Sequence, residues 1–154
     1  MRVYIDTREK PKAIQKIVAY FDKQGIQHES KALKTGDYML EGQERLVVDR
    51  KQSLQELSAN LLSRDRARFY REVKRARAEG IKLIILCEHG RDIKRIEDVK
   101  NWKNPYGKVT GKALMDAIYR CSIAYGVEFL FCEKRNTGKR IIELLTEENE
   151  NGRS

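Results

Sequence analysis

Two short, nearly uninterrupted apolar runs constrain the fold of this chain more than any other feature. They span Ile81 to Cys87 and Val127 to Cys132, and each follows a glycine that can end a helix, Gly80 and Gly126. A short run without polar alternation is typical of a strand that is covered on both faces. Covering both faces of a sheet requires helices on each side. The two runs therefore predict an α/β fold with a central sheet between helices.

The rest of the chain alternates between strand and helix patterns, with one exception. Tyr38–Leu40 and Arg45–Arg50 are strand-like segments joined by the turn at residues 41–44, which predicts a hairpin. Ser53 begins the capping box Ser-Leu-Gln-Glu and predicts that a helix starts there. A hairpin among alternating strands and helices implies a mixed central sheet with helices on both faces. Further strands are expected at residues 3–6 and 26–33, and further helices at 11–25, 66–79, 110–126 and from 136 or 137.

Size and composition indicate one globular domain. The chain has 154 residues, of which 40% are hydrophobic and 36% are charged, enough to bury a core beneath a charged surface. No apolar run approaches the length of about 20 residues that spans a membrane, and the N-terminus lacks a secretory signal. We therefore expect an intracellular protein. The domain is expected to occupy residues 1–146, followed by a polar, disordered tail at residues 147–154.

Residues that could carry chemistry lie near the ends of the predicted hairpin. Asp49 and Lys51 are two residues apart in one strand, so their side chains point to the same face, and Arg50 points to the other. Asp37 lies at the far end of the partner strand, so folding the hairpin brings it close to Asp49. Whether Asp37 faces the same side depends on the register of the hairpin, which the sequence does not determine.

This grouping of acids and a lysine suits the hydrolysis of phosphodiester bonds. Two carboxylates can hold Mg²⁺ or Mn²⁺, and a neighbouring lysine can orient the attacking water and stabilise developing charge. Asp6, at the end of the first strand, and Glu9 just beyond it could complete the acidic cluster. Simpler explanations stay open, because Asp37 after Gly36 suits a turn and Asp6 can pair with Arg8 or cap a helix.

A basic segment follows this cluster. The net charge of +9 and the isoelectric point near 9.5 favour a polyanionic partner, most often nucleic acid. In the helix predicted at residues 66–79, Phe69, Val73 and Ala76 form the apolar stripe. Arginines spaced three or four residues apart share another face, which suits phosphate contacts, although an ordinary solvated helix face also explains them. These arginines are Arg64, Arg68, Arg71 and Arg75.

Three motifs, in order, resemble the nuclease domain of the XPF family, which includes eukaryotic flap endonucleases and the archaeal Hef nuclease. They are Ile5-Asp6-Thr7-Arg8-Glu9, Thr35-Gly36-Asp37-Tyr38 and Val48-Asp49-Arg50-Lys51, and the similarity covers residues 3–145. The resemblance implies a restriction-endonuclease-like core of the PD-(D/E)xK superfamily. It also implies Mg²⁺- or Mn²⁺-dependent cleavage of DNA near branch points such as flaps and forks, as in DNA repair and recombination. The alternative is a non-catalytic DNA-binding or scaffold module with a decayed nuclease site.

The resemblance also implies roles for individual residues. The catalytic group is expected to comprise Asp37, Asp49, Lys51 and Glu9. The metal ligands are expected to be Asp6, Asp37 and Asp49. The expected DNA contacts are Arg8 and Arg50 together with Arg64, Arg68, Arg71 and Arg75.

Two positions depart from the family pattern. The family's glutamate is Asp49 here, so the carboxylate is one methylene shorter and the metal distance or preference can shift. The family often has an aspartate four residues after the lysine, where this chain has Gln55 with Glu56 beside it. This second departure bears on a second metal site more than on activity.

Family members often carry a helicase domain or a C-terminal helix-hairpin-helix pair, and neither fits in this sequence. We therefore expect that targeting to branched DNA comes from this domain, from a homodimer, or from a separate partner. The homodimer would form through the helices around residues 112–125 and 137–147. A compact version of the domain is consistent with a bacterial, phage or mobile-element origin.

Overall fold

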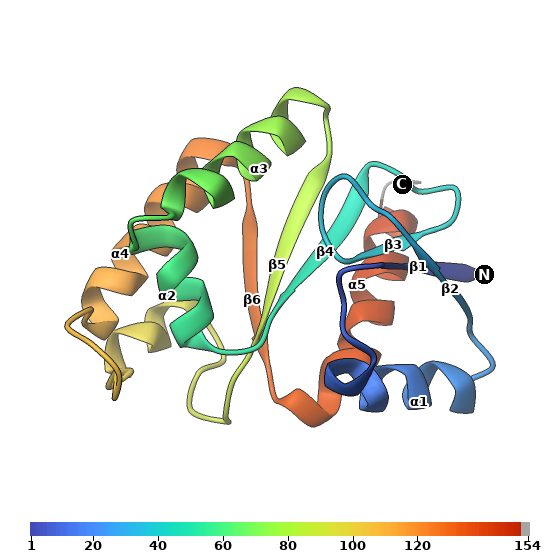
Figure 1. Ribbon diagram of the computed structural model, residues 1–154, viewed down its shortest axis with the longest axis horizontal. Helices are drawn as coiled ribbons and strands as arrows, with labels where there is room; N and C mark the ends of the chain where they lie inside the picture. Colours follow the sequence, from blue (N-terminus) through green and yellow to red (C-terminus); the bar gives the residue numbers. More distant parts are fainter. Residues whose placement is uncertain (152–154) are drawn as a thin grey trace.

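A mixed sheet of six strands forms the centre of the molecule in residues 1–151, the part of the chain that the structure describes (Figure 1). The structure is a computed structural model, in which residues 148–151 are described by their backbone alone. In chain order the strands are β1 (Arg2–Asp6), β2 (Gln27–Lys31), β3 (Tyr38–Leu40), β4 (Leu46–Lys51), β5 (Lys82–Glu88) and β6 (Glu128–Cys132). The α-helices are α1 (Gln15–Lys23), α2 (Leu54–Leu62), α3 (Arg66–Ala78), α4 (Gly111–Tyr125) and α5 (Thr137–Asn151). Three 3₁₀-helices are η1 (Pro11–Ile14), η2 (Ile96–Asn101) and η3 (Lys134–Asn136).

The strands lie in the order β2-β1-β3-β4-β5-β6, and β3 runs antiparallel to both of its neighbours. The pairs β1–β2, β4–β5 and β5–β6 are parallel. The β3–β4 pair is the hairpin that the sequence predicts, with Tyr38 opposite Val48. Strand β5 is buried from Leu83 to Glu88, as expected for an apolar run that is covered on both faces.

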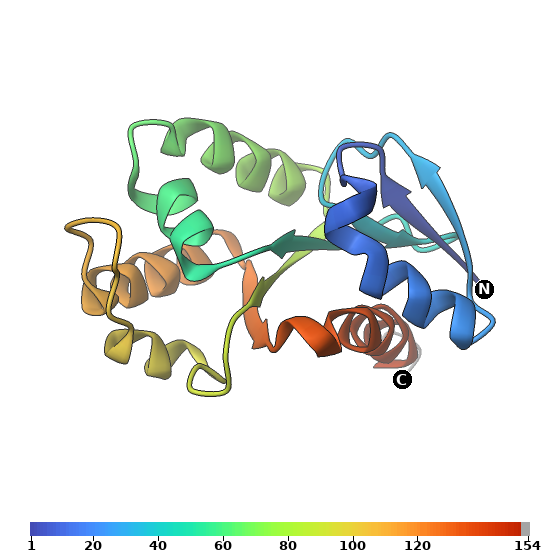
Figure 2. The ribbon, with the colours of Figure 1, turned by 60° about the horizontal axis from the view of Figure 1, so that its bottom comes forward.

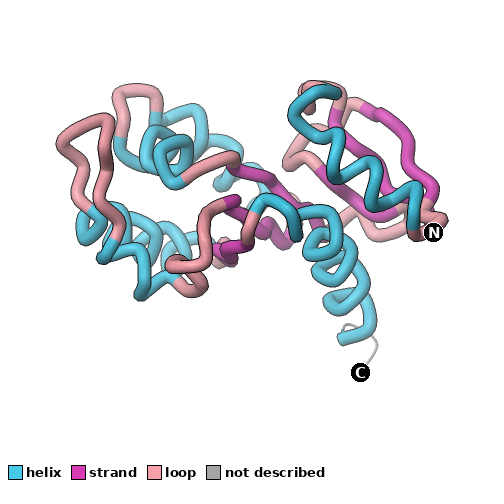
Figure 3. The backbone as a smooth tube through the Cα atoms, turned by 90° about the horizontal axis from the view of Figure 1, so that it is seen from below, coloured by secondary structure: helices cyan, strands magenta, loops and turns pink. Residues whose placement is uncertain are grey.

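Two groups of helices cover opposite faces of the sheet (Figures 2 and 3). Helices α1 and α5 pack side by side over one face, where Phe21 and Ile141 belong to a core shared with β1, β3, β4 and β5. Helices α2, α3 and α4 cover the other face, where Leu57, Val73 and Ile118 belong to a second core. The predicted mixed sheet with helices on both faces is therefore confirmed.

Strand β4 contributes to both cores by strict alternation. Val48 belongs to the core under α1 and α5, whereas Val47 belongs to the core under α2, α3 and α4. Because successive side chains in a strand point to opposite faces, Asp49 and Lys51 continue the Val47 side and Arg50 continues the Val48 side. This alternation decides which helices each of the three charged residues meets.

The helices begin and end close to the predicted boundaries, and short 3₁₀-helices occur in some of the connections. Pro11 opens the short η1 before α1 begins, and η2 interrupts the connection at residues 89–109. In the segment predicted as a tail at residues 147–154, residues 147–151 continue α5, and residues 152–154 lie outside the described residues. No helix in the described part of the chain has the length and apolar character needed to cross a membrane.

Candidate active site

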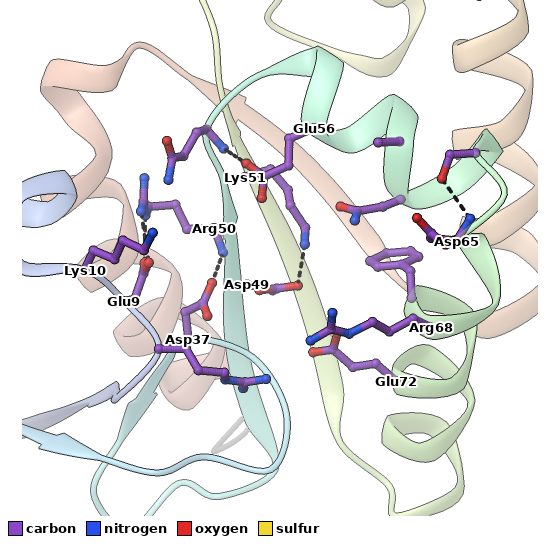
Figure 4. Close-up of a pocket in the computed structure, with 16 residues that line it drawn as sticks. Glu9, Lys10, Asp37, Asp49, Arg50, Lys51, Glu56, Asp65, Arg68 and Glu72 are labelled. Carbon is purple, nitrogen blue, oxygen red and sulfur yellow. Dashed lines mark hydrogen bonds and ion pairs between the residues drawn. The ribbon is translucent and has the colours of Figure 1, made fainter.

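A pocket of about 530 Å³ opens where β4 ends, between the loop after β1 and the helices α2 and α3 (Figure 4). The predicted cap of α2 forms its edge. The Ser53 side chain accepts a hydrogen bond from the backbone N–H of Glu56 at 3.1 Å, and the Glu56 carboxylate accepts one from the N–H of Gln52 at 3.0 Å. These bonds satisfy donors at the start of the helix and begin α2 directly after the segment that carries Lys51.

The hairpin brings Asp37 beside Asp49. The N–H of Asp37 donates to the carbonyl of Val48 at 2.9 Å, and the N–H of Arg50 donates to Asp37 Oδ2 at 2.8 Å. Both acids line the pocket. The register that the sequence left open therefore places the two carboxyl groups together, with Asp49 and Lys51 on one face of β4.

Gly36 makes this approach possible. Its φ angle is 74°, in the left-handed region, and an added Cβ would lie 3.0 Å from the Cβ of Val47. A side chain at this position would be both strained and crowded. The glycine thus allows the turn before β3 to bring Asp37 close to β4.

The electrostatics of the pair are unfavourable without a cation. Burial, and next the Asp49 carboxylate, raise the pKa of Asp37 to about 10. Asp49 itself is 5% exposed, and its Oδ2 accepts no hydrogen bond, although Lys51 Nζ lies 3.2 Å away as an ion pair. Lys51 supplies one positive charge beside two buried carboxyl groups, so this end of the pocket also suits a bound divalent cation.

Lys51 reaches the pocket beside Asp49, from the same face of β4. Burial acts most strongly and lowers the pKa of Lys51, but the carboxylates of Asp49, Glu56 and Glu72 together outweigh burial, so the pKa is raised. Its Nζ lies 5.3 Å from the centre of the Phe69 ring on α3. Lys51 is thus a fixed hydrogen-bond donor and positive charge in the pocket.

The donor set fits a hard divalent cation. Carboxylate oxygens are the ligands that Mg²⁺ and Mn²⁺ prefer, and Mg²⁺ is commonly held by one or two carboxylates while it keeps several waters. Asp37 and Asp49 supply two such groups. Within the described residues, no group of three or more His, Cys, Asp or Glu side chains is already arranged around one point as a metal site.

Asp6, expected to be a metal ligand, is used elsewhere. Its Oδ1 accepts the backbone N–H of Leu33 at 2.8 Å, and its Oδ2 accepts the backbone N–H of Arg8 at 3.2 Å and the Arg8 guanidinium. Asp6 does not belong to the pocket lining, whereas Asp37 and Asp49 do. Both Asp6 oxygens accept hydrogen bonds here, including those from Arg8, which is the simpler alternative that the sequence left open. The role of Asp6 as a metal ligand stays a prediction.

Arg50 and Glu9 form a largely buried ion pair, and both also line the pocket. Arg50 is 4% exposed, and its Nε and Nη2 donate to the two Glu9 oxygens at 2.8 and 2.9 Å. Arg50 Nη1 donates to Glu88 at 3.0 Å, and Tyr38 donates to Glu9 at 3.0 Å. Through this pair Glu9 holds the loop after β1 against β4. The DNA contact expected at Arg50 and the catalytic role expected of Glu9 stay predictions.

The arginines predicted to share one face of α3 differ in their exposure and their contacts. Arg68 is exposed and lines the pocket, and Arg64 and Arg71 are exposed on the same segment. Arg75 donates to the Lys34 carbonyl at 2.5 Å and so ties α3 to the loop before β3. Arg8 joins Arg68 at the pocket, from the opposite wall, with 60% of its side chain exposed.

Glu72 is the acid that sequence reasoning missed. It lines the pocket from α3, and its carboxylate accepts the backbone N–H of Gly36 at 3.1 Å. Burial, and next the Asp49 carboxylate, raise its pKa. In the sequence Glu72 only offsets neighbouring arginines, but it follows Arg68 by four residues, which places both on one face of the helix. Gln55, by contrast, is exposed and does not line the pocket, whereas Glu56 does.

The order and directions of the strands form a sheet similar to that of XPF, a restriction-endonuclease-like fold. The family model of the ERCC4 domain matches residues 5–145, and the chain belongs to this family. The resemblance seen in the three sequence motifs is therefore confirmed.

Two solved structures are similar to this chain over most of its length. XPF from Aeropyrum pernix is 20% identical, with a TM-score of 0.68, and the match covers 97% of this chain and 65% of that chain. XPF from Aeropyrum pernix in complex with DNA is 18% identical, with a TM-score of 0.69, and the match covers 97% of this chain and 66% of that chain. The chain thus spans slightly less than two thirds of the length of either structure. No curated protein matches it.

Proposed function

We propose that the chain is a DNA endonuclease that depends on Mg²⁺ or Mn²⁺ and cuts branched DNA such as flaps and forks. One observation carries this proposal most strongly. Asp49 presents a buried oxygen without a hydrogen bond beside Asp37, and both lie in a pocket that also holds Lys51. Two acids and a lysine in contact are poorly explained by stability alone, because the two carboxyl groups repel each other.

Asp37 and Asp49 would hold the cation. When bound, such an ion lowers the pKa of a water ligand and screens the negative charge of a phosphate. Lys51 would donate hydrogen bonds that orient the attacking water and stabilise charge on the phosphate, and its raised pKa favours the protonated form. Asp49 orients Lys51 through their ion pair.

Basic side chains at the pocket would position the DNA backbone. Arg8 lies on the wall after β1 and Arg68 on the wall formed by α3, with Lys10 near Arg8. Cations on two walls of an acidic pocket can neutralise phosphates on both sides of the bond to be cut. The net charge of +9 and a similar solved structure in complex with DNA support this proposal.

A homodimer or a separate partner would select branched DNA. Helix α4 exposes Ile123, whose side chain is 82% accessible, on the element expected to form a dimer. A sedimentation mass equal to one chain at micromolar concentration would contradict the dimer. A role in DNA repair or recombination follows from the proposed substrate.

The test is cleavage of labelled flap, fork and linear duplex DNA with Mg²⁺, with Mn²⁺ and with EDTA. We expect cutting of branched DNA only with a divalent cation. Asp49→Asn and Lys51→Ala should each abolish cutting and retain DNA binding. Asp116→Asn, which removes an exposed acid of α4 that pairs with Lys112, is the matched control and should cut normally.

The alternative, a DNA-binding or scaffold module with a decayed site, predicts binding without cleavage. The contact between Asp49 and Lys51 and the proximity of Asp37 argue against it, because a decayed site has no reason to keep buried acids together. The absence of metal-dependent cleavage on every substrate would favour this alternative.

A further inference from the structure

Glu72 projects from α3 into the pocket, toward the Asp37–Asp49 pair (Figure 4). Its position depends on helix geometry, because Phe69 and Val73 on either side of it in the helix are buried in the core under α3. Those anchors fix the rotation of α3 and therefore direct Glu72 to the pocket. The half-buried carboxylate of Glu72 is thus held in place by the packing of its own helix.

Glu72 contacts the same turn that places Asp37. Its Oε1 accepts the N–H of Gly36 at 3.1 Å, and Gly36 is the residue whose left-handed conformation allows Asp37 to approach β4. This hydrogen bond occupies one carboxylate oxygen and leaves the charge of Glu72 in the pocket. A carboxylate is not required for that bond, since a neutral amide oxygen accepts it equally well.

The charge of Glu72 acts on Lys51 and Arg8 as well as on Asp49. Asp37, Asp49 and Glu72 come from three different elements, and all three line one pocket. Asp49 is at least nine-tenths buried, and its Oδ2 has no hydrogen-bond donor. Lys51 Nζ lies 3.2 Å from this oxygen as an ion pair, and a third acid nearby adds negative charge that a divalent cation can offset.

We propose that Glu72 is a third acid of the cation site, which strengthens divalent-cation binding by its charge while it holds the Gly36–Asp37 turn by its hydrogen bond. The inference rests on the proposed metal-dependent function and deepens it. It means that α3 contributes an acid to the cation site in addition to those of the hairpin motifs. It also distinguishes Glu72 from Glu56, whose carboxylate caps α2.

The experiment measures Mn²⁺ binding to the metal-free protein by titration calorimetry, and bound Mn²⁺ by electron paramagnetic resonance. The variants are Glu72→Gln, which keeps an acceptor for Gly36, and Glu72→Ala, which removes charge and acceptor together. Glu79→Gln is the matched control, because it removes an exposed acid that directly follows the same helix outside this pocket. Asp49→Asn defines binding outside the site.

Glu72→Gln should weaken Mn²⁺ binding by about tenfold or more, the usual effect of changing a group that supports metal ligands. Its melting temperature without metal should not fall. Glu72→Ala should weaken binding at least as much and should also lower the melting temperature. Glu79→Gln should bind Mn²⁺ as the unchanged chain does.

Other results overturn the assignment. Unchanged Mn²⁺ binding in Glu72→Gln with loss in Glu72→Ala would mean that Glu72 acts only through its hydrogen bond. Equal weakening in Glu72→Gln and Glu79→Gln would mean that only net charge matters. If the unchanged chain binds Mn²⁺ no better than Asp49→Asn, the metal-dependent function fails together with the role of Glu72. If the calorimetric results are as expected but no DNA is cut, only the proposed nuclease function fails.

Discussion

The backbone N–H of Arg50 donates a hydrogen bond to the carboxyl group of Asp37, at 2.8 Å across the β3–β4 hairpin. This bond connects the two motifs that carry the proposed chemistry. It uses one oxygen of Asp37 and keeps the group next to Asp49, the residue before Arg50. Because the donor is a backbone group of β4, the position of Asp37 depends on the register of the hairpin and not on a flexible side chain.

Asp37→Asn should stabilise the metal-free protein and abolish cleavage. Burial and the Asp49 carboxylate raise the pKa of Asp37 to about 10, above the value of about 4 for an unfolded chain. The stability linked to the raised pKa is present below about pH 4 and is lost as the pH rises toward about 10. Asparagine removes this loss and retains an acceptor for the Arg50 N–H.

Thermal unfolding in EDTA at pH 5 and at pH 8 measures this effect. The melting temperature of Asp37→Asn should exceed that of the unchanged protein by a few degrees at pH 8, about 2–4 °C for each kcal/mol, and by less at pH 5. Mn²⁺ should raise the melting temperature of the unchanged protein, since a ligand of the folded state stabilises it, but not that of the variant. A variant that is less stable at pH 8 in EDTA would contradict the raised pKa.

Arg50→Met should destabilise the fold strongly while leaving DNA affinity of the folded protein intact. The substitution leaves Glu9 and Glu88 buried without their shared partner, and removing one member of a buried ion pair costs about 3–5 kcal/mol. Urea unfolding gives the loss, and fluorescence anisotropy below the melting temperature gives DNA affinity.

Arg91→Met is the matched control for Arg50→Met, because Arg91 pairs with Glu133 at the surface and its side chain is 79% exposed. An exposed pair contributes at most about 1 kcal/mol. If Arg50→Met were as stable as this control and bound DNA less well, Arg50 would be the DNA contact that the sequence first implied.

The sequence predicts the fold and the faces of β4 on which the charged residues lie, for a physical reason. Strand alternation is local, so it places Asp49 and Lys51 on one face and Arg50 on the other before any tertiary contact is known. Which oxygens a side chain contacts depends on segments far along the chain. Leu33, whose backbone N–H donates to Asp6, lies 27 residues away along the chain.

The position of Glu72 also depends on contacts between distant segments, which the sequence alone does not predict. Its neighbours in sequence are arginines, and its contact with Gly36 spans 36 residues. Only the docking of α3 against the sheet, through Phe69 and Val73, reveals that this acid faces Asp49. A helical spacing argument identifies the face that Arg68 and Glu72 share but not what that face meets.

Gly36→Ala should weaken both stability and cation binding. At a φ of 74° an alanine is strained, and its Cβ would lie 3.0 Å from the Cβ of Val47. The expected cost is about 1–3 kcal/mol in the free energy of unfolding, with movement of Asp37 away from Asp49. Gly25→Ala is the control, because its φ of 69° is equally strained but nothing lies within 4 Å of its Cβ. Equal stability loss and equal Mn²⁺ affinity in both variants would show that crowding at Gly36 does not matter.

Arg68→Ala should weaken DNA binding without loss of stability. Arg68 is exposed and lines the pocket, so its removal costs the fold little, while one phosphate contact is lost. In the Asp49→Asn background, which prevents cutting, the slope of log affinity against log salt should fall by about one.

Arg77→Ala is the matched control, since Arg77 lies on the same helix, carries the same charge and donates to the Ala124 carbonyl on α4. It should lower the melting temperature slightly and leave the salt dependence unchanged. Equal losses of affinity in Arg68→Ala and Arg77→Ala would mean that DNA responds to the total charge of the domain. A loss confined to Arg68 would mean that the backbone of DNA passes over the wall of the pocket that α3 forms, opposite Arg8.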